Sequence, residues 1–88
     1  MRIDILGTKY KVVETDDNNN IGEDTWGLVQ HSDSTIQIRK SLGKQCKNLT
    51  LWHEIIHAID YKLSLDFDEE TTDRMAQAVA YVVNNNKI

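Results

Sequence analysis

The chain has 88 residues, which is enough for one small domain and too short for a second one. Its formal net charge is −4 and its basic residues are scattered, which argues against a nucleic-acid partner. It contains no apolar run of about 18 residues, the length that a membrane span requires. Charges within residues 1–10 argue against a secretory signal, so we expect a cytoplasmic protein. Because the single cysteine, Cys46, excludes an intramolecular disulfide, we expect a metal or a partner to supply additional stability.

The first half of the sequence alternates between apolar and polar residues, a pattern that is typical of half-buried strands. We predict strands at residues 2–6, 10–14, 26–30 and 35–39. The polar, asparagine-rich segment between the second and third strands is predicted to be a loop. Trp26, at the start of the third strand, and Trp52 are predicted to be core residues.

From Asn48 the spacing of apolar residues changes to the helical period of 3.6. We predict a helix from there to residue 63, with Asn48 or Thr50 as its N-cap. A second helix follows, and residues 68–73 are predicted to open it. Strands followed by helices predict a single α+β domain over residues 1–88, with a small, mostly antiparallel sheet of three to four strands and then two helices.

The first predicted helix contains the motif His-Glu-x-x-His, formed by His53, Glu54 and His57. Residues four apart lie one turn apart on the same face of a helix, so His53 and His57 can bind one zinc ion. Glu54 lies beside His53, where its carboxylate can accept a proton from a zinc-bound water. The alternative is a polar helix face on which two histidines happen to be four residues apart. The rarity of the motif in so short a chain favours zinc.

A catalytic zinc site needs a third protein ligand. No histidine follows His57 closely, which excludes the metzincin arrangement and leaves a carboxylate from the second helix. Glu69 is predicted to face the first helix and Glu70 to face away, which favours Glu69 and keeps Glu70 as the alternative. Asp73 is placed to accept the free N–H of one ligand histidine.

Each of these carboxylates also has a structural alternative. Glu69 could complete a capping box with Asp66, since it would then occupy the third helical position. Asp73 could interact with Gln77, four residues later on the same helix face. Helical facing therefore favours the metal site without excluding these roles.

Residues 51–83 resemble the small zinc metallopeptidase-like proteins that phages and mobile elements encode. Those proteins are relatives of the ImmA/IrrE type among the zincins, with a glutamate as the third ligand. The matching residues are His53, Glu54, Ile55, Ile56, His57, Ala58, Glu69, Thr72, Asp73 and Ala76, while Met75 stands where the family usually has an aromatic residue. The resemblance extends to residues 26–39 and is weaker over residues 1–24. It implies a minimal zincin fold, zinc on the two histidines and Glu69, and Glu54 as the catalytic base.

The resemblance also implies hydrolysis of a peptide or protein, such as a repressor encoded beside the peptidase. Zincins present an edge strand to an extended substrate, and residues 35–39 are predicted to be that strand. His31 and Tyr61 are candidate donors to the oxyanion, although a structural or exposed position explains each of them equally simply. The interval of 12 residues between His57 and Glu69 is short for this family, which argues against a deep substrate cleft.

The sequence therefore leaves three functions open. The first is a zinc-dependent peptidase, and the second is a non-catalytic zincin-like protein in which zinc is structural or the fold binds a partner. The third is a regulatory α+β protein without a metal. The intact Glu54 favours the first, because a structural zinc site has no need of a base. The small size of the chain favours the second.

Overall fold

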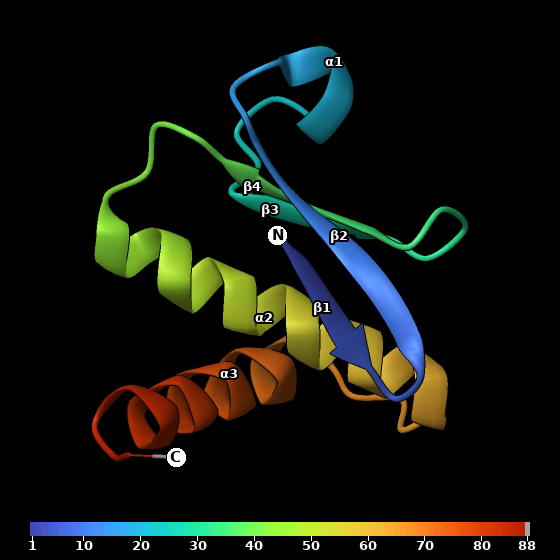
Figure 1. Ribbon diagram of the computed structural model, residues 1–88, viewed down its shortest axis with the longest axis vertical. Helices are drawn as coiled ribbons and strands as arrows, with labels where there is room; N and C mark the ends of the chain where they lie inside the picture. The colour runs from blue at the N-terminus through green and yellow to red at the C-terminus, as the bar shows by residue number, and fades with distance from the viewer. Residues whose placement is uncertain (88) are drawn as a thin grey trace.

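The structure is a computed structural model that describes residues 1–87 (Figure 1). Its elements are β1 (Arg2–Ile5), β2 (Thr8–Thr15), α1 (Asn18–Ile21), β3 (Gly27–Gln30), β4 (Thr35–Arg39), α2 (Lys44–Leu63) and α3 (Glu69–Asn84). A sheet followed by two long helices confirms the predicted α+β fold. Within the described residues, no helix is both long and apolar enough to cross a membrane.

The four strands form one sheet in the order β1-β2-β4-β3. The pairs β1–β2 and β3–β4 are antiparallel, and β2–β4 is parallel, so the sheet is mixed and mostly antiparallel. β4 lies between two neighbours, and β3 lies at the edge. The prediction that residues 35–39 form the edge strand is therefore wrong. Ile36 and Ile38 of β4 are both buried, as expected for an interior strand whose inner face meets a helix.

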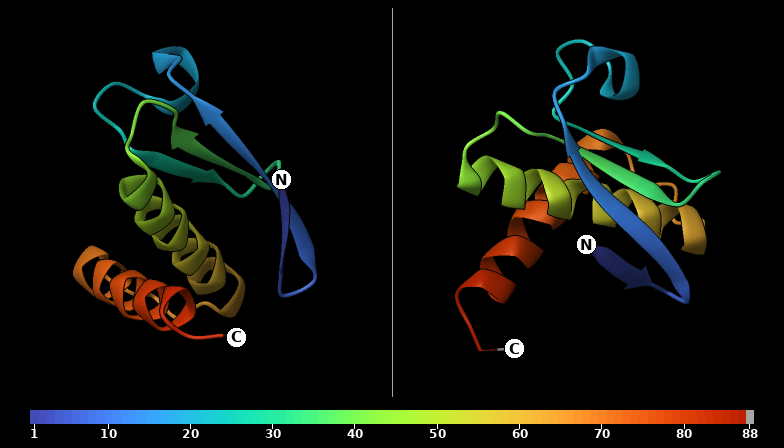
Figure 2. Two further views of the ribbon diagram at one scale, coloured as in Figure 1. Left: turned by 60° about the vertical axis from the view of Figure 1, so that its left-hand side comes forward. Right: turned by 45° about the horizontal axis from the view of Figure 1, so that its top comes forward.

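Both long helices lie on the same side of the sheet (Figures 1 and 2). α2 packs directly on the sheet, and α3 packs on α2, so α2 is the middle of three layers. The core between the sheet and α2 is formed by Ile5, Tyr10, Ile36, Ile38, Ile55 and Ala58. α2 therefore presents two faces to neighbouring elements.

The N-caps of both long helices differ from those considered from the sequence. α2 begins at Lys44, so the predicted caps Asn48 and Thr50 lie inside the helix, and Gly43 occupies the N-cap without a side-chain hydrogen bond. Residues 44–47 continue the helix without the apolar spacing that marked its later turns. α3 is capped by Asp68, whose carboxylate accepts a hydrogen bond from the Thr71 backbone N–H at 2.7 Å. The alternative role of Glu69 in a capping box with Asp66 is therefore excluded, because Asp66 is not the N-cap.

The segment predicted to be a loop contains the short helix α1, whose Ile21 is buried. Arg39, at the end of β4, fixes this segment. Its Nε donates to the Thr25 carbonyl at 3.0 Å, and its Nη2 donates to the Gly22 carbonyl at 2.5 Å. Because the guanidinium group bridges several carbonyl groups at once, the segment before β3 is held against the sheet.

Candidate metal centre

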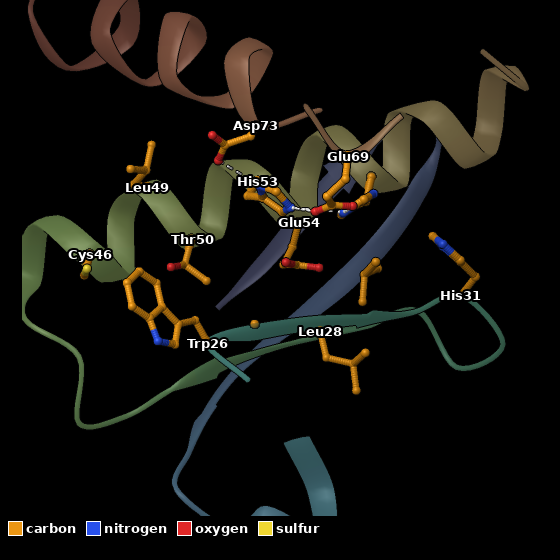
Figure 3. Close-up of a pocket in the computed structure, with 13 residues that line it drawn as sticks. Trp26, Leu28, His31, Cys46, Leu49, Thr50, His53, Glu54, Glu69 and Asp73 are labelled. Carbon is orange, nitrogen blue, oxygen red and sulfur yellow. Dashed lines mark hydrogen bonds and ion pairs between the residues drawn. The ribbon is translucent and has the colours of Figure 1, made fainter. Parts of the chain in front are cut away.

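His53, His57 and Glu69 meet at the side of α2 where the first turn of α3 approaches it (Figure 3). The two histidine Nε2 atoms lie 3.1 Å apart. Glu69 Oε1 lies 2.6 Å from His53 Nε2, and Glu69 Oε2 lies 3.4 Å from His57 Nε2. One ligand atom from each of the three residues lies within 4.8 Å of the other two. The three residues that the sequence nominated as ligands therefore converge on one point.

The donor set fits a zinc ion. Two imidazole nitrogens and one carboxylate are the ligands of a known class of catalytic zinc sites, with bonds of about 2.0–2.1 Å to nitrogen. Two nitrogens that share one tetrahedral ion at that bond length lie about 3.3 Å apart, which is close to the separation of the two Nε2 atoms here. The helical spacing produces this approach, because residues four apart face the same side of α2.

The neighbouring carboxylates take separate roles. Glu70 forms an ion pair with Arg74 at 2.7 Å on the exposed side of α3, away from the histidines. Asp73 Oδ1 lies 3.6 Å from His53 Nδ1, and its Oδ2 accepts a hydrogen bond from Gln77 at 2.8 Å. Asp73 thus combines the two positions considered for it: it pairs with Gln77, and it stands next to the ring nitrogen of His53 that faces away from the cluster.

Glu54 is buried although it is charged at neutral pH in water; only 6% of its surface is exposed. Burial raises the pKa of its carboxyl group, and the Glu69 carboxylate acts in the same direction. His57 and His53 oppose this effect, as does the backbone amide of Val29. A carboxylate that is poorly hydrated and close to two histidines has the raised proton affinity that a general base near neutral pH requires.

Gly27 allows the edge strand to approach Glu54. A Cβ atom at Gly27 would lie 2.6 Å from Thr50 Cγ2 and 3.1 Å from both Cγ and Oε2 of Glu54. Any side chain here would push β3 away from α2. Sequence reasoning did not nominate Gly27, although a glycine inside a predicted strand is itself a signal of close backbone approach.

A pocket of about 520 Å³ contains the cluster, despite the short connection from His57 to Glu69. Its lining residues are Trp26, Gly27, Leu28, Val29, His31, Cys46, Leu49, Thr50, His53, Glu54, His57, Glu69 and Asp73. The prediction of Trp26 as a core residue is wrong, because 57% of its surface is exposed and it stands at the pocket. Trp26 precedes the edge strand rather than an interior one, so no further strand covers it. Trp52, by contrast, packs against the core.

His31 and Tyr61, the two candidate oxyanion donors, contact each other. Their rings stack with centroids 3.8 Å apart and planes inclined by 5°. The buried Tyr10 hydroxyl lies 3.5 Å from His31 Nδ1. His31 lines the pocket and Tyr61 does not. Burial lowers the pKa of His31, and the nearby His57 lowers it further, so the ring is neutral at pH 7.

Comparisons with family models, curated proteins and solved structures found no match for this chain. The interpretation of the site therefore depends on the arrangement of its own residues.

Proposed function

We propose that this protein is a zinc-dependent metallopeptidase of minimal zincin type. The observation that supports the proposal is a single pocket that contains a His-His-Glu cluster and a buried fourth residue, Glu54, whose carboxyl pKa is raised. A structural zinc site would need only the cluster. A buried carboxylate beside the cluster lowers the stability of the fold, and such a group is typical of a functional site.

His53, His57 and Glu69 would hold the ion, and Asp73 would orient the ring of His53. Zinc in such a site supplies Lewis acidity and lowers the pKa of a water molecule. The Glu54 carboxylate takes the proton of the attacking water and later delivers it to the leaving amine. His31 is neutral and lines the same pocket, so its ring N–H can donate to the oxygen that gains charge.

The strand β3 is the proposed platform for the substrate, in place of the strand at residues 35–39. It lies at the edge of the sheet, and three of its residues line the pocket: Gly27, Leu28 and Val29. An extended peptide added along this edge would form main-chain hydrogen bonds beside the cluster. The resemblance to phage-encoded peptidases makes a cytoplasmic protein, such as a repressor, the first substrate to test.

A non-catalytic zincin-like protein is the second candidate. It is favoured by one observation: α3 packs mainly on α2, so a metal between these helices would also act as a clamp. In that case Glu54 would have no chemical task. The two functions therefore differ in what a change at Glu54 does.

The test compares metal content and peptide cleavage in the wild-type protein, Glu54→Gln and His53→Ala. We expect about one zinc per chain in the wild type and in Glu54→Gln, and at least tenfold less in His53→Ala. Cleavage of a peptide library should fall by two or more orders of magnitude in Glu54→Gln. Cleavage that survives this change contradicts the assignment of the base. Zinc binding without cleavage of any library member supports the second candidate.

A further inference from the structure

The two ends of the pocket differ in chemistry. Trp26, Cys46 and Leu49 lie at one end, and His31 lies at the other, with the His-His-Glu cluster between them (Figure 3). The cluster region carries the carboxylates of Glu54, Glu69 and Asp73. The three residues at the first end are uncharged. A pocket that is charged in its centre and apolar at one end can distinguish substrates by the side chain that this end receives.

Trp26 is the largest feature of the apolar end. An exposed tryptophan leaves a large apolar surface in water, which is unfavourable unless a ligand covers it. Hydrogen bonds fix the backbone on both sides of this residue. The Arg39 N–H donates to the Trp26 carbonyl at 2.8 Å, and Arg39 Nε donates to the carbonyl of Thr25, the preceding residue. The ring is thus mounted on a rigid strand end, and binding a ligand there costs little ordering of the backbone.

The apolar end adjoins the reacting centre. Trp26 directly precedes Gly27, the residue whose Cβ position lies 3.1 Å from Glu54 Oε2. Leu49 precedes His53 by four residues, so it lies one helical turn before the first ligand on the same face of α2. A peptide whose reacting carbonyl lies at the cluster would therefore place the side chain of an adjacent residue between Trp26 and Leu49.

We propose that Trp26, Cys46 and Leu49 form a binding subsite for an apolar side chain next to the bond that is cleaved. This inference rests on the proposed peptidase function and adds the substrate class, namely peptides with an aliphatic or aromatic residue at that position. Acidic side chains are rejected by the carboxylates in the centre of the pocket.

The experiment measures hydroxamate binding to the zinc-loaded protein by calorimetry. Acetohydroxamate and hexanohydroxamate share one metal-binding head and differ by four methylenes in the tail. A fully buried methylene contributes about fourfold in affinity, so a partly enclosed tail should make hexanohydroxamate bind at least tenfold more tightly. We expect Trp26→Ala and Leu49→Ala to reduce this ratio to threefold or less. Acetohydroxamate binding should stay within twofold of the wild-type value in both variants.

Tyr81→Ala is the matched control for Trp26→Ala. Tyr81 is an aromatic residue on α3 with 69% of its surface exposed, and it does not line the pocket. The tail-dependent ratio should be unchanged in this variant. Equal affinity for both hydroxamates in the wild type, or an unchanged ratio in both pocket variants, overturns the subsite.

A second titration separates failure of the subsite from failure of the metal centre. In a Trp52→Phe protein, Trp26 is the only tryptophan, and its emission can be followed after zinc has been removed with a chelator. Hexanohydroxamate should still shift this emission at millimolar concentration, and acetohydroxamate should not, because the apolar contact needs no metal. If neither ligand binds the zinc-loaded protein but the emission shift is retained, the result contradicts the metal centre and leaves the subsite standing. Loss of the shift contradicts the subsite.

Discussion

The two sides of α2 are built differently. The side that faces the sheet packs Ile55 and Ala58 into a core with the isoleucines of β4. The side that faces α3 meets a helix whose buried residues are Thr72, Ala76 and Ala80. Small side chains bury little apolar area, and the free energy gained from burial scales with that area. The sheet side of α2 therefore meets large buried side chains, whereas α3 contributes only small buried side chains to the other side.

This difference separates the parts of the candidate centre. Glu54 belongs to the well-packed side, where it is almost fully buried opposite Gly27. Glu69 belongs to the α3 side, and 71% of its side chain is exposed. The fold alone therefore positions the proposed base, whereas a bound metal would restrain the proposed third ligand. Zinc would stabilise the α2–α3 interface most.

Removing the metal should have the largest effect on stability, and it should act mainly on the α3 side of α2. A ligand present at about 1,000 times its dissociation constant stabilises the folded state by about 4 kcal/mol. We expect a chelator to remove this stabilisation in thermal melts, and amide hydrogen exchange to accelerate in α3 before it does in α2. Glu69→Ala should reproduce both effects in the presence of zinc, because it removes the ligand that α3 supplies.

Glu70→Ala is the control, because it removes a carboxylate one residue away that pairs with Arg74 on the surface. An exposed pair of this kind contributes less than about 1 kcal/mol. If Glu70→Ala loses zinc and Glu69→Ala retains it, the ligand assignment must be exchanged. If exchange accelerates equally in both helices on chelation, the two sides of α2 do not differ as argued.

The packed side can be tested by Gly27→Ala, for which we expect an intermediate effect. The new methyl group would meet Thr50 Cγ2 at 2.6 Å, so the strand or the helix must shift. Such overpacking costs typically 1–3 kcal/mol. Thr50→Ser removes the opposing methyl group, and the double variant should recover part of the loss in a denaturation series. Strictly additive losses in the single and double variants would contradict the steric explanation.

Features of the fold and the site that depend on spacing within one helix or strand could be predicted from the sequence, whereas features that depend on contacts between distant segments could not. The proximity of His53 and His57 and the facing of Glu69 follow from spacing within single helices, and both were predicted. The start of α2 was placed four residues late, because Lys44, Gln45 and Lys47 carry no apolar spacing to mark the helix. Asp66 was one possible cap of α3, and the sequence alone does not separate it from Asp68, whose side chain offers the same capping chemistry.

Features that depend on contacts between distant segments were not predicted. The position of β4 inside the sheet depends on its parallel pairing with β2, which no local pattern encodes. The exposed position of Trp26 follows from that topology, since its strand becomes the edge. The stacking of His31 on Tyr61 joins residues 30 positions apart, and their residue types alone gave no sign of it.

The His31–Tyr61 stack lies at the rim of the packed side, and we expect the smallest effect there. The pKa of His31 is lowered, so the unfolded chain binds a proton at a pH where the folded protein does not. Folding stability should therefore fall as the pH drops from about 6.5 through the folded-state pKa. Tyr61→Ala returns the ring to water and should raise the pKa of His31 toward its ordinary value in an NMR titration, whereas Tyr81→Ala should leave it unchanged. If Tyr61→Ala leaves the pKa of His31 unchanged, the stack on Tyr61 does not cause the shift. Other residues around His31 must then bury its ring.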